Sequence, residues 1–193
     1  MKLPLLVRAA SNVAAWIDRT FLIVLVAAIA LLVLMNVGTR LFGFTISWAD
    51  ELAVYFMILA GFVGASLMLR LRTDPAVTLL HEFLPEPAVR GLRGAVAVIA
   101  LVFGLVLAWL CWRWFNLPGL YAAGFDIRRF EGSTFNFIYT EMTPVMGLPA
   151  MIFFLIVPWF ALTISIHAMT NLLEEAGVLE REQAAKDAMV GEG

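Results

Sequence analysis

Four long apolar runs without a charged side chain divide the sequence. They cover residues 21–37, 52–69, 95–112 and 142–166. A membrane-spanning helix needs about 20 mostly apolar residues, since the hydrocarbon core of a bilayer is about 30 Å thick and a helix rises about 1.5 Å per residue. Backbone that faces lipid must satisfy its own hydrogen bonds, so each run should be helical. With their flanking residues, the runs predict spans over about 20–39, 50–70, 93–114 and 142–168.

An amphipathic pattern precedes the first span. Apolar residues recur there at helical spacing, and the polar residues fall mostly elsewhere on the helical wheel; the apolar positions are Leu5, Leu6, Ala9, Val13, Trp16 and Ile17. This pattern is typical of a helix that lies in the membrane surface. We therefore predict an interfacial N-terminal helix, with the alternative that this segment simply extends the first span. No small-residue cleavage site follows the first apolar run, so we expect the run to be retained.

The composition narrows the class of protein. Of the 193 residues, 62% are hydrophobic and 15% are charged, whereas soluble domains are roughly 45–50% apolar and about 25% charged. A soluble enzyme is therefore excluded, and the net charge of −2 gives no basic surface for nucleic acid. The single cysteine, Cys111, excludes an internal disulfide framework and a cysteine-based zinc site. The sequence predicts one all-α integral membrane domain over residues 1–193.

The basic residues predict the orientation of the four spans. One side of the membrane would receive nine of the 13, namely Lys2, Arg8, Arg19, Arg70, Arg72, Arg90, Arg93, Arg181 and Lys186. The other four are Arg40, Arg113, Arg128 and Arg129. By the positive-inside rule, both termini should lie in the cytoplasm.

The cytoplasmic connections carry their own signals. Asp74 followed by Pro75 is typical of a helix start, and Pro85 and Pro87 mark its end, so we predict a short surface helix between the second and third spans. Residues 171–193 form an acidic tail that we expect to be a short, fraying helix. Within the fourth span, Pro158 should kink the helix.

The first outer loop is short, so the two spans that it joins should be packing neighbours. Ser47 is a candidate cap of the second span, Trp48 suits the membrane interface, and Asp50 and Glu51 would complement the helix dipole in its first turn. Alternatively, these carboxylates form with Arg40 a polar patch that a partner subunit contacts. Both interpretations remain open at this point.

The outer segment from 114 to 141 is the largest hydrophilic excursion. It contains Asp126, Arg128 and Arg129 among several aromatic residues, and it is too short for a domain. It is either a solvated connector or a surface that receives a docking protein.

Ionisable residues inside a bilayer usually mark ion pathways or proton relays, and the four apolar runs contain no Asp, Glu, Lys, Arg or His. His81 falls in a loop and His167 at the end of the last span, so the facing pair that ligates a haem is not expected. No metal, cofactor or catalytic residue is therefore predicted. An anchor or scaffold subunit of a membrane complex is one alternative that remains, and a small membrane redox protein is a weaker one.

Several segments in order resemble the small membrane subunit, of the DctQ type, of tripartite ATP-independent periplasmic transporters. The similarity covers nearly the whole chain. It includes an amphipathic N-terminal segment and four spans with both termini in the cytoplasm. Its motifs are Arg40-Leu41-Phe42-Gly43-Phe44-Thr45-Ile46-Ser47-Trp48-Ala49-Asp50-Glu51, then Phe62-Val63-Gly64-Ala65-Ser66 with Arg70, and Thr143-Pro144-Val145-Met146-Gly147-Leu148-Pro149.

The resemblance implies a three-part importer in the bacterial inner membrane. A periplasmic solute-binding protein captures an organic acid or related solute, and a large polytopic permease subunit carries it, driven by a cation gradient that is usually sodium. The small subunit would be a non-catalytic scaffold in contact with lipids, the permease and the binding protein. The partner contacts that we predict are Arg40, Trp48, Asp50, Glu51 and Arg70, and the candidate docking charges are Asp126, Arg128 and Arg129.

Overall fold

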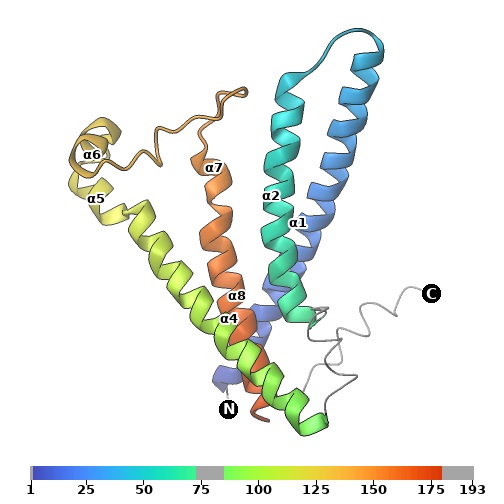
Figure 1. The fold of residues 1–193 in the computed structure, drawn as a ribbon. Helices are drawn as coiled ribbons and strands as arrows, with labels where there is room; N and C mark the ends of the chain where they lie inside the picture. The colour runs from blue at the N-terminus through green and yellow to red at the C-terminus, as the bar shows by residue number, and fades with distance from the viewer. Residues whose placement is uncertain (1, 73–84, 180–193) are drawn as a thin grey trace.

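The computed structural model describes residues 2–72 and 85–179 (Figure 1). Within these residues the regular structure is helical: α1 (Lys2–Leu41), α2 (Ser47–Leu71), α4 (Glu86–Phe115), α5 (Leu117–Ala122), α6 (Ile127–Thr134), α7 (Met151–Phe154) and α8 (Ile156–Glu175). Four stretches are long and apolar enough to cross a membrane, namely Leu3–Leu41, Ser47–Leu71, Ala88–Ala122 and Met151–Glu175. The predicted class, an all-α protein with four membrane-spanning helices, is confirmed.

The segment before the first span is continuous with it. Helix α1 has 40 residues, about 60 Å of helix, which is twice the hydrocarbon thickness. No proline or glycine interrupts residues 5–37, so nothing in the sequence ends the helix there. A separate interfacial helix is therefore not observed, and the alternative of a longer first helix describes the structure. Its apolar residues, such as Leu6 and Trp16, are exposed, and the polar Ser11 and Asp18 face the protein.

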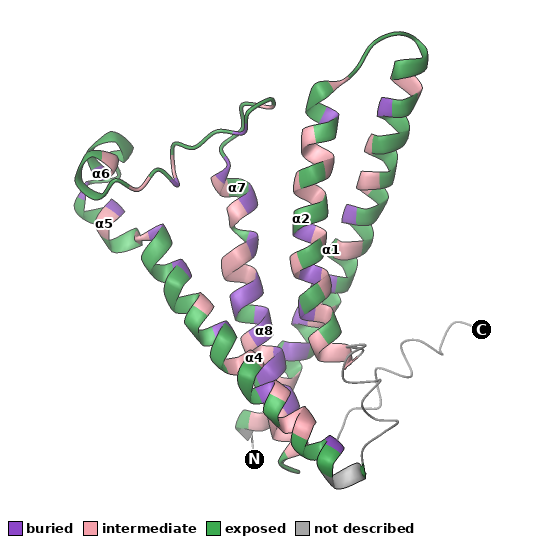
Figure 2. Cartoon of the chain, viewed as in Figure 1, coloured by how far each residue is buried: buried purple, intermediate pink, exposed green. Residues whose placement is uncertain are grey.

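Helix α8 lies at the centre of the arrangement. Helices α1 and α2 form one antiparallel pair, α4 packs against α8, and α8 also contacts α1 and α2 (Figure 1). Buried residues are concentrated along α8, while the other three long helices expose most of their surface (Figure 2). We call the end with the N-terminus and the end of α8 the N-terminal end, and the opposite end, with the 42–46 loop and α6, the loop end.

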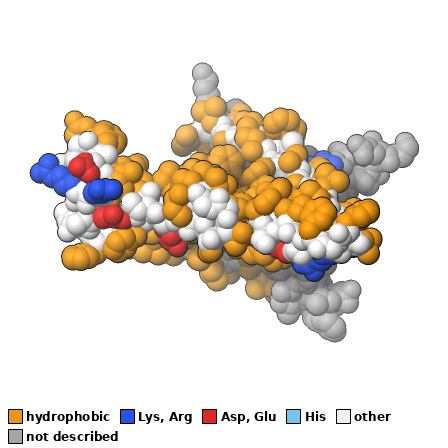
Figure 3. Space-filling view, turned by 90° about the horizontal axis from the view of Figure 1, so that it is seen from above, with side chains coloured by type: hydrophobic (Ala, Val, Ile, Leu, Met, Phe, Trp, Pro, Cys, Tyr) orange, Lys and Arg blue, Asp and Glu red, His pale blue; other side chains and the backbone are white. Residues whose placement is uncertain are grey.

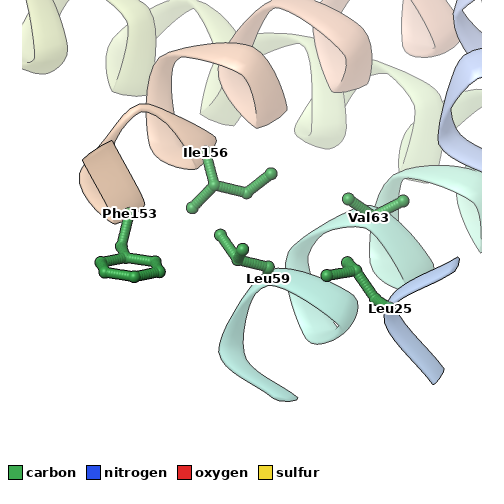
Figure 4. Packing of buried hydrophobic residues seen from close by; sticks show 5 residues of the cluster. All are labelled: Leu25, Leu59, Val63, Phe153 and Ile156. Atoms are coloured by element: carbon green, nitrogen blue, oxygen red, sulfur yellow. The ribbon is translucent and has the colours of Figure 1, made fainter. Parts of the chain in front are cut away.

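The main apolar cluster joins three of the long helices near the start of the fourth span. It consists of Leu25, Leu59, Val63, Phe153 and Ile156 (Figure 4). Next to it, the Tyr55 ring stacks on Phe153 with 4.1 Å between ring centroids. These contacts fix α2 against α7 and α8.

The fourth span begins later than predicted. Residues 142–150 form a turn instead of helix, closed by an isolated bridge between Met142 and Pro149, and the first helical residue is Met151. Pro144 and Pro149 lack the amide donors that a helix needs, and Gly147 has φ +64°. The helical assignment is interrupted at Leu155, between α7 and α8, three residues before Pro158. The kink at Pro158 stays a prediction.

The connections at the N-terminal end differ from the prediction where they are described. The surface helix predicted between the second and third spans falls on residues 73–84, outside the described residues. The acidic tail was predicted from residue 171, but α8 continues to Glu175, and Glu174 is buried. Residues 180–193 of that tail lie outside the described part of the chain.

Candidate subunit-interaction site

A small polar network joins α1 and α2 at the loop end. The Asp50 carboxylate accepts a hydrogen bond from the Asn36 amide and another, of 3.1 Å, from Nη2 of Arg40. The Asn36 Oδ1 in turn accepts from the Ile46 amide at 3.4 Å. Ile46 occupies the N-cap position of α2 and no side chain caps this helix, so the prediction that Ser47 is the cap is wrong. Asn36 closes the hairpin instead.

The outward side of this network is open to solvent or to another protein. The side chains of Arg40 and Asp50 are 59% and 56% exposed, and Trp48 is 46% exposed. An ion pair at this exposure contributes at most about 1 kcal/mol to stability. Arg40 and Asp50 therefore form an accessible ion pair, and Trp48 is an exposed side chain of the same hairpin. We call these three residues the hairpin patch.

Glu51 points elsewhere, toward the turn before α7. Its carboxylate accepts hydrogen bonds from the backbone amide of Val145, at 3.1 and 3.2 Å, and from that of Met146, at 2.6 Å. The residue is half-buried. The two adjacent acidic residues that the sequence presents as a pair thus bind different parts of the chain.

Arg70 lies at the N-terminal end, far along α2 from the hairpin patch. Its guanidinium pairs with Glu174 of α8 at 3.2 Å and donates to Oδ1 of Asn12 in α1 at 2.8 Å. Arg72, in the left-handed conformation that ends α2, pairs with Glu174 at 3.0 Å and also with Glu175. We call these four charged residues the inner clamp, because they fasten α2 to α8.

Polar side chains of the long helices also meet inside the bundle. Between α1 and α8, Ser11 bonds Nδ1 of His167 at 2.8 Å, and Nε1 of Trp159 donates to Asp18 at 2.8 Å. Between α2 and α8, Ser66 donates to Thr163 at 2.8 Å. Sequence reasoning missed this set because Asp18 precedes the first apolar run, but the spacing of Ser11, Ala14, Asp18 and Leu25 along one face of α1 was a detectable signal.

The candidate docking charges lie on α6 at the loop end. Asp126 is the N-cap of α6 and accepts from the Arg129 amide at 3.2 Å, which gives it a structural role. Arg128 and Arg129 are exposed. Seen from above, charged side chains gather at the end of the molecule where α6 lies, and a few others lie along the rest of this face among hydrophobic and uncharged polar groups (Figure 3).

The outer segment has a small core of its own and is anchored to α4. Leu120, Ala123 and the fully buried Phe130 form that core, with Tyr139 packed against it. The Tyr139 hydroxyl donates to the carbonyl of Phe115 at the end of α4. Burial raises the pKa of this hydroxyl, so it stays protonated and able to donate. The segment is therefore an ordered platform rather than a loose connector.

The described residues offer no group of three or more His, Cys, Asp or Glu side chains that could hold a metal ion. His167 is fully buried and bonded to Ser11. His81, the other histidine of the sequence, lies outside the described residues. The arrangement supports contacts between helices and at the two ends of the bundle.

Comparison with known protein families gives one match that covers most of the chain. Residues 29–177 match the family model of the DctQ component of tripartite ATP-independent periplasmic transporters. The chain belongs to the DctQ family. This identifies it as the small subunit of such a transporter, and with its four apolar helices it is a multi-pass membrane protein. Comparison with curated proteins gives no match, and neither does comparison with solved structures.

The DctQ match includes the hairpin patch, the turn bound by Glu51, the platform and the inner clamp. It begins at residue 29, after Ser11 and Asp18, which supply the α1 side of the contacts with His167 and Trp159. The family assignment therefore rests on the region from the middle of α1 to just past the end of α8.

Proposed function

We propose that this DctQ-family chain is a non-catalytic scaffold that holds the large permease subunit and helps to dock the periplasmic binding protein. The transporter would import an organic acid or related solute across the bacterial inner membrane by symport with a cation. Both termini would lie in the cytoplasm, which places the hairpin patch and the platform on the periplasmic side.

The observation that carries the scaffold role is the use of the buried ionisable side chains. Asp18, His167 and Glu174 each bond a side chain of another helix of this chain. Intramembrane ionisable groups commonly serve a solute or ion path. Here each of the three binds a side chain of a neighbouring helix through at least one of its polar atoms, which favours a supporting role over transport by this chain alone.

The exposed apolar surface supports the same role. Helices α1, α2 and α4 expose large apolar side chains along much of their length (Figure 2). Lipid and a large permease are the two environments that would cover such a surface in a membrane. The hairpin patch supplies charged and aromatic contacts at one end of it, and Arg128 and Arg129 supply exposed charges at the platform for the binding protein.

Co-purification with the large permease subunit tests the scaffold role. We expect the tagged chain to retain that subunit through washing in detergent, and Arg40→Asp or Asp50→Arg to reduce the retained amount. The double variant, Arg40→Asp with Asp50→Arg, rebuilds the internal ion pair with reversed signs. If the permease subunit contacts these charges directly, the double variant should still retain less of that subunit than the unaltered chain. Full recovery of the retained amount would mean that the ion pair stabilises only this chain.

Docking of the binding protein is tested separately, on the assembled pair of membrane subunits. Replacing Arg128 and Arg129 by Glu should weaken its capture, with Arg113→Glu as a control charge change at the end of α4. If the unaltered chain, the Arg128 and Arg129 variant and the Arg113→Glu control all capture the binding protein equally well, the platform is not part of the docking surface.

A further inference from the structure

The turn that Glu51 contacts is built to receive a carboxylate. Its own hydrogen bonds use other amides: Thr143 donates to the carbonyl of Leu148 at 2.8 Å, Leu148 donates to Oγ1 of Thr143 at 2.9 Å, and Gly147 donates to the carbonyl of Thr143 at 3.1 Å. The successive amides of Val145 and Met146 both donate to Glu51. Consecutive amides of a turn form a concave site for negative charge.

The surrounding contacts support this attachment. Tyr55 follows Glu51 by one helical turn and stacks on Phe153, while Met146 packs against the main apolar cluster. The polar contact and the apolar contacts therefore join the same two elements, the first half of α2 and the segment that leads into α7. Glu51 lies at the solvent-facing end of this joint.

The neighbouring carboxylate has a different partner set. Asp50 bonds Asn36 and Arg40, which belong to α1. The two acidic side chains therefore diverge, one toward the hairpin and one toward the outer turn. This divergence makes Asp50 a matched control for Glu51, with the same charge one residue away.

We propose that Glu51 is a positioning residue, which fixes the outer turn 142–149 against α2 and thereby the place where the fourth span starts. It acts within the chain, through the amides of Val145 and Met146. The turn presents the exposed Val145 and Leu148 at the loop end. Their use in binding another subunit rests on the proposed function, whereas the positioning itself rests on the geometry alone.

Hydrogen–deuterium exchange on the full chain in lipid nanodiscs tests the proposal. In Glu51→Ala, the amides of residues 145 and 146 should exchange about tenfold faster or more, because two bonds to a charged acceptor are lost. Glu51→Gln keeps one oxygen acceptor and should give a smaller increase. Asp50→Ala should leave these amides unchanged and should affect residues 42–46.

Exchange at 145 and 146 that is no faster in Glu51→Ala than in Asp50→Ala would overturn the proposal. If Glu51→Ala does not fold, the comparison of Glu51→Gln with Asp50→Asn decides in the same way. Association with the permease is measured in parallel on the same variants. If the unaltered chain does not bind the permease, the proposed function is refuted. Faster exchange at residues 145 and 146 in Glu51→Ala would still support the positioning role of Glu51 in that case.

Discussion

Replacing Glu174 by Gln is the most informative test of how the N-terminal end is held. The Glu174 side chain is 3% exposed and binds two guanidinium groups, with Arg70 at 3.2 Å and Arg72 at 3.0 Å. The side chain of Arg70 is 9% exposed and that of Arg72 is 28% exposed. The amide has nearly the same shape as the carboxylate but no charge, so the substitution removes a negative charge that faces both Arg70 and Arg72.

The expected loss in the free energy of unfolding depends on the contacts that Arg70 and Arg72 keep in the variant. Breaking a buried ion pair by removing one partner costs about 3–5 kcal/mol. Arg70 keeps its bond to Asn12, and Arg72 keeps Glu175. These contacts reduce the loss, and we expect the free energy of unfolding to fall by about 2–3 kcal/mol, within the range for one or two hydrogen bonds to charged groups.

Reversible unfolding of the purified chain in mixed micelles measures this loss. The matched control is Asp50→Asn, which neutralises an acid of an exposed ion pair at the opposite end and should cost under about 1 kcal/mol. A double-mutant cycle that combines Arg70→Gln with Glu174→Gln isolates the pair and should give a coupling of about 1–2 kcal/mol. A loss for Glu174→Gln no larger than that of the control would refute the inner clamp as a fastening of α2 to α8.

Three further outcomes are expected. Gly104→Ala should loosen α4 from α8, because a Cβ there would lie 2.4 Å from Oγ of Ser165, whereas Gly64→Ala meets open space and should cost little in thermal stability. The platform should be stable below about pH 10 and lose stability above it, since the pKa of Tyr139 is raised in the folded state; Tyr139→Phe should remove this pH dependence in a fluorescence titration. Asp18→Leu should lower the unfolding temperature more than Asp18→Asn, which keeps an oxygen for the Trp159 indole, and equal losses would count against that hydrogen bond.

The number of membrane-spanning helices and their order were predictable because lipid imposes a simple rule on the sequence. Uncharged runs of sufficient length mark spans, and the four runs correspond to four apolar helices. The residues at which the spans begin and end were predicted less accurately. Residues 142–150 are apolar enough for a span, yet they form a turn, because two prolines lack the amide donors that a helix needs and Gly147 is left-handed.

The partners of the candidate contact residues were also not predictable from the sequence. The sequence drew attention to Asp50 and Glu51 as a pair, but their partners, Asn36 and the amides of Val145 and Met146, depend on which helices meet. The contacts of Arg70 with Glu174 and Asn12 join residues that are 104 and 58 positions apart. Charge and spacing along one chain do not specify such pairs, because they are set by the packing of α8 between its neighbours.

Solute uptake by reconstituted vesicles would show whether the transporter needs this chain. The vesicles would contain the large permease subunit and receive the binding protein with its solute, with or without this chain, under an imposed cation gradient. We expect uptake when the chain is present and little or none when it is absent. Equal uptake without the chain would contradict the claim that this DctQ-family protein is the scaffold that the transporter requires.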